Sequence, residues 1–127
     1  ELPDAEGLKT IYGASGKAIK ELLLDQSLLC GIGNLYSDEI LFRAGLHPKT
    51  RGKDLSPDDF AGLRDAIGQT LADALQAKEP GSPPFEVQAY GRTDELCGVC
   101  STPIARLRLA NRSAHFCPQC QPRRRSA

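Results

Sequence analysis

Two pairs of cysteines form the clearest chemical pattern in this sequence. The stretch CGVC, with Cys97 and Cys100, precedes the stretch CPQC, with Cys117 and Cys120, and sixteen residues separate the pairs. Each pair can form a small loop whose two thiolates reach one ion, and a hairpin between the pairs would complete a tetrahedral zinc site. The segment is too short for a hydrophobic core, so the metal is expected to supply its folding free energy. We therefore predict one structural Zn²⁺ ion, in preference to a redox dithiol.

The segment between the cysteine pairs has the pattern of a basic hairpin. The stretch IARLRLA alternates apolar residues with Arg106 and Arg108, residues 111–113 supply a turn that carries Arg112, and AHF supplies a returning strand. No acidic residue follows Glu95, so this part has a net charge of +6, against −6 for the part before it. Because arginine offers a planar fork of donors that suits phosphate, we predict contacts with nucleic acid. A solvated basic face without a partner is the alternative.

The stretch GIGN, residues 31–34, is a second candidate for an anion site. Its glycines let the backbone approach another surface closely, and we expect Asn34 to cap the helix that follows. The free N–H groups at the start of that helix, beside Gly33 and the Asn34 amide, would form a phosphate site. A glycine turn that merely joins two helices is the alternative.

The rest of the chain predicts a mainly α-helical fold. We expect four helices, the first three at residues 4–12, 17–25 and 35–44, and a fourth of about five turns that follows Ser56 and Pro57, with caps at Asp4, Ser15, Asn34 and Ser56. In the fourth helix the apolar residues recur at helical spacing, namely Phe60, Leu63, Ile67, Leu71 and Leu75. A linker rich in Pro and Gly begins at residue 78, and a short extended run is expected at residues 85–92.

Two domains are expected within the 127 residues. Residues 1–80 would form the helical domain, and residues 81–127 would form the linker, the four-cysteine zinc-ribbon β-hairpin and a basic tail. No apolar run approaches the length of a membrane helix, and the charged start ELPDAEGLK lacks the features of a secretory signal. Thiolate metal ligands suit a reducing compartment, so we expect a cytoplasmic, nucleoid-associated protein without membrane contact.

Several other polar residues are interpreted as structural. His47 is expected to cap or pack at a helix end, and His115 alternates with the apolar side of the hairpin, next to a zinc site that four cysteines already complete. Asp38 and Glu39 lie in the first turns of a helix, where negative charge suits the helix dipole. The fifth cysteine, Cys30, is expected to be a small buried apolar residue.

Two parts of the sequence resemble one known family. The run IKELLLDQSLLCGIGNLYSDEILFRAGLHP, residues 19–48, closely resembles the helix–two-turns–helix segment of the formamidopyrimidine-DNA glycosylase and endonuclease VIII family. The YGR of residues 90–92, the four-cysteine pattern and NRSAHFCPQCQ resemble the family's zinc finger, in the same order and spacing. The resemblance, which covers residues 17–121, implies a helix–two-turns–helix bundle followed by the zinc-ribbon hairpin. It also implies double-stranded DNA, damaged or abasic, as the partner, because the family's enzymes excise oxidised bases and cleave the strand.

The resemblance also implies roles for single residues. Asn34, with Gly33 beside it, would bind a phosphate of the damaged strand, and Lys20 would lie near that backbone. Arg112, at the hairpin tip, would contact a phosphate flanking the flipped nucleotide, while the four cysteines would hold the zinc. Phosphate contacts on both sides of a lesion hold a duplex bent while the base leaves the stack.

The sequence also departs from the family's pattern. The family's nucleophile is an N-terminal proline amine, followed by a glutamate and a β-rich domain, and none of these is found in this sequence; Glu1 is not expected to take the glutamate's role. The stretch KEPGSPPFEVQ is also shorter than the family's segment with the loop that closes over the extruded base. We therefore expect a DNA-binding module that is inactive alone. The alternatives are an active enzyme that uses the terminal amine or Lys20, and a module that docks a repair protein.

Overall fold

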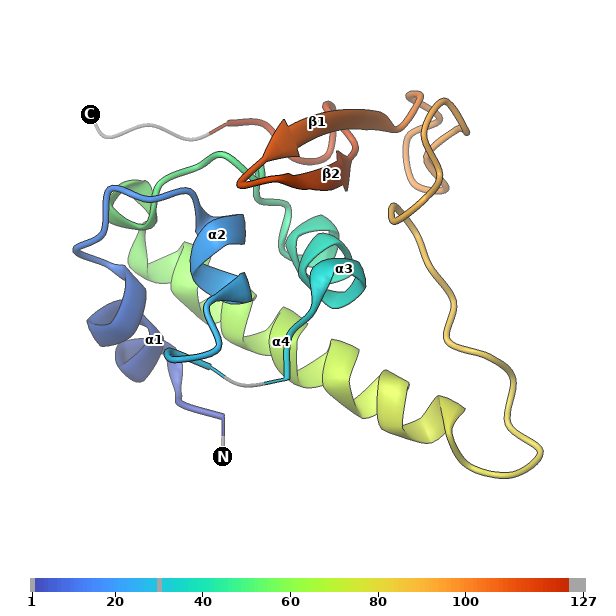
Figure 1. Ribbon diagram of the computed structural model, residues 1–127, viewed down its shortest axis with the longest axis horizontal. Coiled ribbons are helices and arrows are strands. Elements are labelled where there is room, and N and C mark those ends of the chain that lie inside the picture. The colour runs from blue at the N-terminus through green and yellow to red at the C-terminus, as the bar shows by residue number, and fades with distance from the viewer. Residues whose placement is uncertain (1, 30, 124–127) are drawn as a thin grey trace.

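The computed structural model describes residues 2–29 and 31–123, so the predictions for Glu1, for Cys30 and for the end of the basic tail lie outside the described residues. In chain order the elements are α1 (Ala5–Tyr12), α2 (Ile19–Leu24), α3 (Asn34–Ala44), the short 3₁₀ helix η1 (Gly52–Asp54), α4 (Pro57–Ala77), β1 (Ala105–Leu109) and β2 (Arg112–Phe116). Helices α1 and α3 pack against α4, α2 packs against α3, and the β1–β2 hairpin lies across α2 and α3 (Figure 1). This arrangement confirms the predicted fold class.

Two of the four predicted helix caps are confirmed. The carboxylate of Asp4 accepts a hydrogen bond from the N–H of Gly7, and Ser56 forms a capping box with Asp59 before Pro57. The other two predictions are wrong. Helix α2 starts at Ile19 without a side-chain cap, and Asn34 is the first residue of α3 rather than its cap. The amide of Asn34 is therefore free of a capping role.

A single apolar core holds the helices together. Buried side chains from all four helices meet there, among them Leu8, Tyr12, Ile19, Leu23, Ile40, Leu41, Phe60, Leu63 and Ile67. The predicted apolar face of α4 is thus confirmed for most of its length, but Leu75 is 67% exposed. The reason is visible in Figure 1, where the last turns of α4 extend beyond the other helices. None of the described helices is long and apolar enough to span a membrane.

The hairpin forms where the sequence predicts it. Strands β1 and β2 are antiparallel, with register pairs from Ala105↔Phe116 to Leu109↔Arg112. The turn lies one to two residues earlier than predicted, at Ala110 and Asn111, which both have positive φ. The extended run predicted for residues 85–92 forms no strand in the described part of the chain. Its backbone is held by a helix side chain instead.

Buried polar side chains join the helical part to the zinc ribbon. The carboxylate of Glu39 on α3 accepts three backbone N–H bonds, from Gln88 at 2.6 Å and from Ala89 and Tyr90 at 2.8 Å each. At the other end of the ribbon, the Gln121 amide accepts from the N–H of Cys117 at 2.8 Å and donates to the carbonyl of Leu46 at 2.9 Å. Both ends of the ribbon are therefore fastened to α3 and the residues after it.

Candidate nucleic-acid interface and metal centre

The four predicted metal ligands come together at the base of the hairpin. The sulfur atoms of Cys97, Cys100, Cys117 and Cys120 all lie within 4.8 Å of one another. The closest pairs are Cys100–Cys117 at 3.4 Å, Cys100–Cys120 at 3.6 Å and Cys97–Cys120 at 3.9 Å. Sulfurs placed about 2.3 Å from a tetrahedral zinc are about 3.8 Å apart, so the cluster has the right size. The four cysteines form a site for one zinc ion.

The protonation of these thiols is uneven. The hydroxyl of Thr102, 3.3 Å from the sulfur of Cys100, lowers the pKa of that thiol to about 6. Burial, together with hydrogen bonds to the other thiols, raises the pKa of Cys120 to about 12. A bound divalent cation would favour the deprotonated form of all four thiols, since zinc ligation requires thiolates. The four thiols therefore fit zinc, and they release protons when zinc binds.

The predicted arginines of the hairpin face solvent. Arg106 and Arg108 are exposed on alternate positions of β1, and Arg112 is exposed at the start of β2, next to the turn. Arg106 also donates to the hydroxyl of Ser113 at 3.3 Å. The structure thus presents three guanidinium groups along one hairpin, as a basic interface requires.

The start of α3 offers the second candidate anion site. The N–H of Ser37 donates to the carbonyl of Gly33 at 2.9 Å, and the N–H groups ahead of Ser37 precede the helical hydrogen-bond ladder. Gly33 is exposed, and the side-chain oxygen of Asn34 is buried without a hydrogen-bond partner in the described chain. That oxygen is an acceptor and does not itself bind an anion. The backbone N–H groups, with the donor end of the Asn34 amide beside them, are what this helix start offers to an anion.

Lys20 is also predicted to lie near DNA, but unlike the exposed arginines of the hairpin it is buried. Its side chain is fully buried on α2, where the ammonium group pairs with Asp38 and donates to the carbonyl of Ser113 at 3.1 Å. Burial lowers the pKa of Lys20, the Asp38 carboxylate opposes that shift, and the nearby charge of Arg112 adds to it. The ammonium group is therefore occupied inside the protein, beside the residue that follows Arg112.

Asp38 and His115 are buried partners beside the candidate site, a pairing that the sequence did not reveal. One oxygen of the Asp38 carboxylate accepts from the backbone N–H of His115 at 3.1 Å and lies 2.8 Å from its ring Nδ1. Asp38 is buried, so its predicted role at the helix dipole is not its main one. The same correction holds for Glu39. Adjacent acids in a helix usually face solvent, and nothing local to the sequence marks these two as buried.

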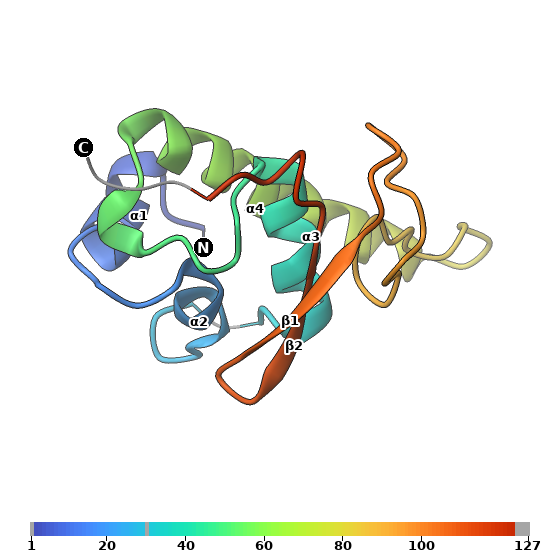
Figure 2. The same ribbon diagram turned by 90° about the horizontal axis from the view of Figure 1, so that it is seen from above.

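These contacts place the two candidate phosphate sites on one side of the molecule. In Figure 2 the hairpin tip lies beside α2, on the same side as the chain that enters α3. Lys20 bridges α3, through Asp38, and the hairpin, through Ser113. The positions of Asn34 and Arg112 are therefore fixed relative to each other by a buried polar network.

Family models match both halves of the chain. Residues 4–85 match the formamidopyrimidine-DNA glycosylase H2TH domain, and residues 94–123 match the zinc finger found in FPG and IleRS. The formamidopyrimidine-DNA glycosylase of Rippkaea orientalis is 45% identical over 115 residues, which cover 81% of this chain and 41% of that protein. The enzyme of Geobacter sulfurreducens is 45% identical over 116 residues, covering 82% of this chain and 43% of that protein.

Solved structures give the same result. A complex of Lactococcus lactis Fpg with DNA containing Fapy-dG has a TM-score of 0.88 and 34% identity, covering 94% of this chain and 48% of that one. A complex of the same enzyme with DNA containing an abasic site has a TM-score of 0.85 and 32% identity over the same shares. The chain thus spans less than half the length of these relatives and matches their H2TH and zinc-finger parts. It belongs to the formamidopyrimidine-DNA glycosylase family.

Proposed function

We propose that this chain clamps double-stranded DNA through backbone phosphates at a damaged or abasic site. The start of α3, with Gly33 and Asn34, would hold one phosphate, and Arg112 at the hairpin tip would hold another, assisted by Arg106 and Arg108. The observation that carries this proposal is the presence of free N–H donors and an exposed guanidinium on the same side of one polar network. The related structures, which contain Fapy-dG or abasic DNA, support the choice of damaged DNA.

Within this clamp we propose that Lys20 positions Arg112 and does not touch DNA. Its ammonium group is fully buried and bound to Asp38 and Ser113, which leaves it without access to a phosphate in this conformation. The same burial argues against Lys20 as a Schiff-base nucleophile, because an attacking amine must reach the sugar. The two predicted domains, residues 1–80 and 81–127, would act as one clamp.

In the complete protein, we propose that this clamp serves a bifunctional DNA glycosylase and AP lyase. For the chain by itself we propose DNA binding without strand cleavage. Thiolate zinc ligands suit a reducing compartment, which supports work in the cytoplasm on nucleoid DNA. A second candidate is the docking of a repair protein, favoured by Leu96 and Val99, which are 59% and 74% exposed beside Cys97.

The test is a salt-dependent binding titration with duplex DNA, intact or carrying an abasic-site analogue. Arg112→Ala should weaken binding and lower the slope of log K against log salt by about 0.9, as expected for one lost phosphate contact. Asn34→Ala should weaken binding to the abasic duplex with little change in the slope, because a neutral amide neutralises no phosphate charge. Arg64→Ala, which removes an exposed arginine from α4, is the matched control and should change the slope little.

Two results would contradict the proposal. Binding that ignores salt and both substitutions would favour the protein-docking candidate. Formation of a borohydride-stable complex with abasic DNA, together with strand cleavage, would show that the chain carries a nucleophile of its own.

A further inference from the structure

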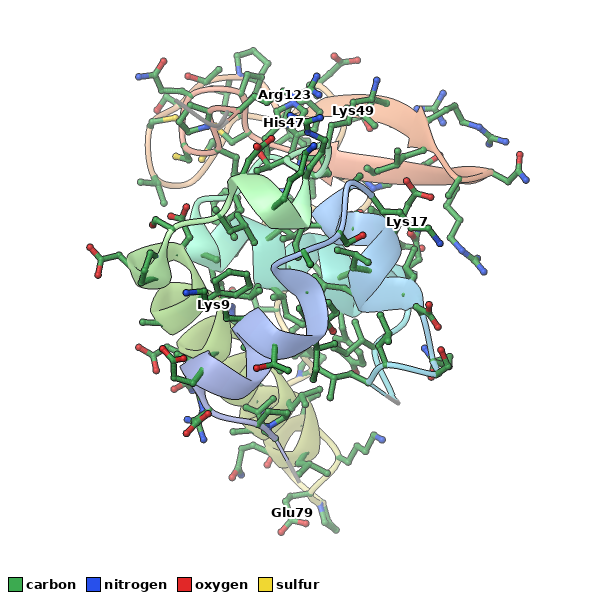
Figure 3. All side chains as sticks on the ribbon, turned by 90° about the vertical axis from the view of Figure 1, so that its left-hand side faces the viewer. Lys9, Lys17, His47, Lys49, Glu79 and Arg123 are labelled. Carbon is green, nitrogen blue, oxygen red and sulfur yellow. The ribbon has the colours of Figure 1, made fainter. Side chains whose placement is uncertain are left out.

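A group of basic side chains lies apart from the proposed clamp. We name it the flank patch and define it as Lys17, His47, Lys49 and Arg123. Figure 3 shows His47, Lys49 and Arg123 close together at one end of the molecule, with Lys17 between them and the lower helices. Lys17, Lys49 and Arg123 are exposed, and the described residues offer none of them an ion-pair partner at salt-bridge distance. None of the four has a place in the clamp.

Backbone hydrogen bonds join the segments that carry Lys17 and Lys49. The segments on either side of the Ala18↔Arg51 bridge run antiparallel. The N–H of Ile19 donates to the carbonyl of Thr50 at 2.7 Å, and the N–H of Gly52 donates to the carbonyl of Lys17 at 3.1 Å. Two segments distant in the sequence are thereby joined, and their lysines occupy fixed backbone positions.

The imidazole of His47 ties the patch to the zinc ribbon. Its Nδ1 accepts the backbone N–H of Lys49 at 3.0 Å, and its ring packs edge-on against Phe116 with the centroids 4.6 Å apart. Nδ1 is thus an acceptor, so a neutral His47 carries its proton on Nε2 and offers one more donor. Phe116 belongs to β2, the strand that begins with Arg112. The patch and the clamp are therefore attached to the same hairpin.

The charges of the patch act on one another. Burial lowers the pKa of His47, and the positive charges of Arg123 and Lys49 lower it further. At the border of the patch Arg51 is neutralised by Asp54 at 2.9 Å, and Lys17 stabilises the charge of Asp25 at longer range. What sets the flank patch apart is the proximity of His47, Lys49 and Arg123 to one another, which Figure 3 shows. Such a surface attracts a polyanion.

We propose that the flank patch binds backbone phosphates of the same duplex, on the arm that extends beyond the clamp. This inference rests on the proposed function. Lysine and arginine side chains that contact phosphates add affinity without reading sequence, and they act at successive positions along a backbone. A duplex held at Arg112 and Asn34 carries negative phosphates beyond the clamp. A neighbouring surface with positive side chains attracts these phosphates, whereas an acidic surface repels them. The patch would lengthen the DNA footprint of the chain.

The experiment compares two duplexes with the abasic-site analogue at their centre. One spans about one helical turn, about 10 base pairs, and the other spans about three turns. The double variant Lys49→Ala/Arg123→Ala should bind the short duplex like the unmodified chain. On the long duplex it should bind several-fold more weakly, and its log K against log salt slope should fall by about 0.9 for each lost phosphate contact, about 2 in all.

Matched variants distinguish the effect of removing charge from the flank patch from the effect of lowering the net charge of the chain. Lys9→Ala/Lys78→Ala removes the same charge from exposed lysines outside the patch, Lys9 lying well away from it in Figure 3, and should leave the long-duplex slope nearly unchanged. Lys49→Arg/Arg123→Lys keeps the charge and should bind like the unmodified chain. Thermal melting should show all variants folded, since the altered residues are exposed.

The outcomes distinguish this inference from the proposed function. If the unmodified chain fails to bind either duplex, the proposed function fails and the patch inference with it. If the unmodified chain binds and Lys49→Ala/Arg123→Ala binds the long duplex equally well, or loses no more than Lys9→Ala/Lys78→Ala, the patch inference alone is overturned. An acidic protein as the true partner of the patch would give that second result.

Discussion

The ammonium group of Lys20 on α2 donates a hydrogen bond of 3.1 Å to the carbonyl oxygen of Ser113, the residue that follows Arg112 on the hairpin. These residues are 93 positions apart in the sequence, so the contact exists only in the folded chain. Because Lys20 also pairs with Asp38 on α3, one buried cation joins both elements that carry the proposed phosphate contacts. The relative positions of α3 and the hairpin therefore depend on this cation.

Replacing Lys20 should therefore reduce stability more than it alters the electrostatics of DNA binding. Lys20→Met leaves Asp38 buried with one partner fewer, and breaking such a pair costs about 3–5 kcal/mol. Urea unfolding measures this loss, with the exposed Lys9→Met as control. At urea concentrations below the unfolding midpoint of Lys20→Met, where the variant is folded, its slope of log K against log salt for DNA binding should match that of the unmodified chain. A slope lowered by about 0.9 would mean that Lys20 does contact a phosphate.

Metal removal should affect both the ribbon and the clamp. Metal analysis should find about one zinc per chain, and a strong chelator should lower the melting temperature and weaken DNA binding, because β2 carries both Arg112 and the chain to Cys117. Cys117→Ser should lose the zinc, whereas Cys30→Ser, outside the two cysteine pairs, should keep it. Full zinc content in Cys117→Ser would contradict the proposed ligand set.

Alkaline pH should destabilise the helical core through Tyr12. The phenol of Tyr12 is fully buried and its hydroxyl has no hydrogen-bond partner in the described chain, and burial raises its pKa from 10.0 to about 12. The unfolded chain ionises first as pH rises past 10, so stability is intact below pH 10 and falls between pH 10 and 12. Each pKa unit corresponds to about 1.4 kcal/mol, which gives a loss of about 3 kcal/mol.

Tyr12→Phe is the control for that loss. It removes the ionising group and a buried unpaired hydroxyl, so it should be as stable as the unmodified chain at pH 7, or more stable by about 1 kcal/mol. Unfolding measured from pH 9 to 12 should show a smaller decline for Tyr12→Phe. Identical declines for the two proteins would rule out Tyr12 as the source.

Glu39→Gln should loosen the chain that enters the zinc ribbon. The carboxylate of Glu39 accepts three backbone N–H bonds. In Glu39→Gln one carboxylate oxygen becomes an NH2 group, which is itself a donor and cannot accept a hydrogen bond from these N–H groups. We expect a loss of about 3 kcal/mol in the free energy of unfolding. The exposed Glu86→Gln, close to the same segment, should change stability by less than about 0.5 kcal/mol. Equal stability of the two variants would show that the hydrogen bonds of Glu39 do not stabilise the chain that enters the zinc ribbon.

Local patterns in the sequence predict the parts of this fold that depend on local chemistry. The spacing of the four cysteines predicts the metal cluster, the alternation around Arg106 and Arg108 predicts β1, and Ser56 with Pro57 predicts the start of α4. The strand and the helix start are set by neighbours within one strand or one turn, and the metal cluster is set by two local Cys-x-x-Cys loops that one hairpin brings together. The roles of Asn34 and Arg112 in DNA binding stay predictions.

The polar network that aligns the site was not predictable in the same way. Lys20, Asp38 and Glu39 have the composition of an exposed helix surface, and only the arrival of the hairpin and of residues 88–90 buries them. Their partners are mostly backbone atoms, which carry no residue-specific signal. The burial of Lys20 was not predictable for this reason, and its position relative to DNA stays a prediction.

The anchors at the two ends of the ribbon bear on how fast zinc can return after it is lost. Glu39 holds the backbone at residues 88–90, and Gln121 holds the chain at Cys117 and Leu46. A ribbon without metal is therefore a loop closed at its base by the helical domain, not a free tail. Closing a loop accounts for much of the entropy lost in assembling a site from distant residues, and here the protein retains that closure. The thiols stay concentrated near one another, so zinc can be exchanged without unfolding the rest of the chain.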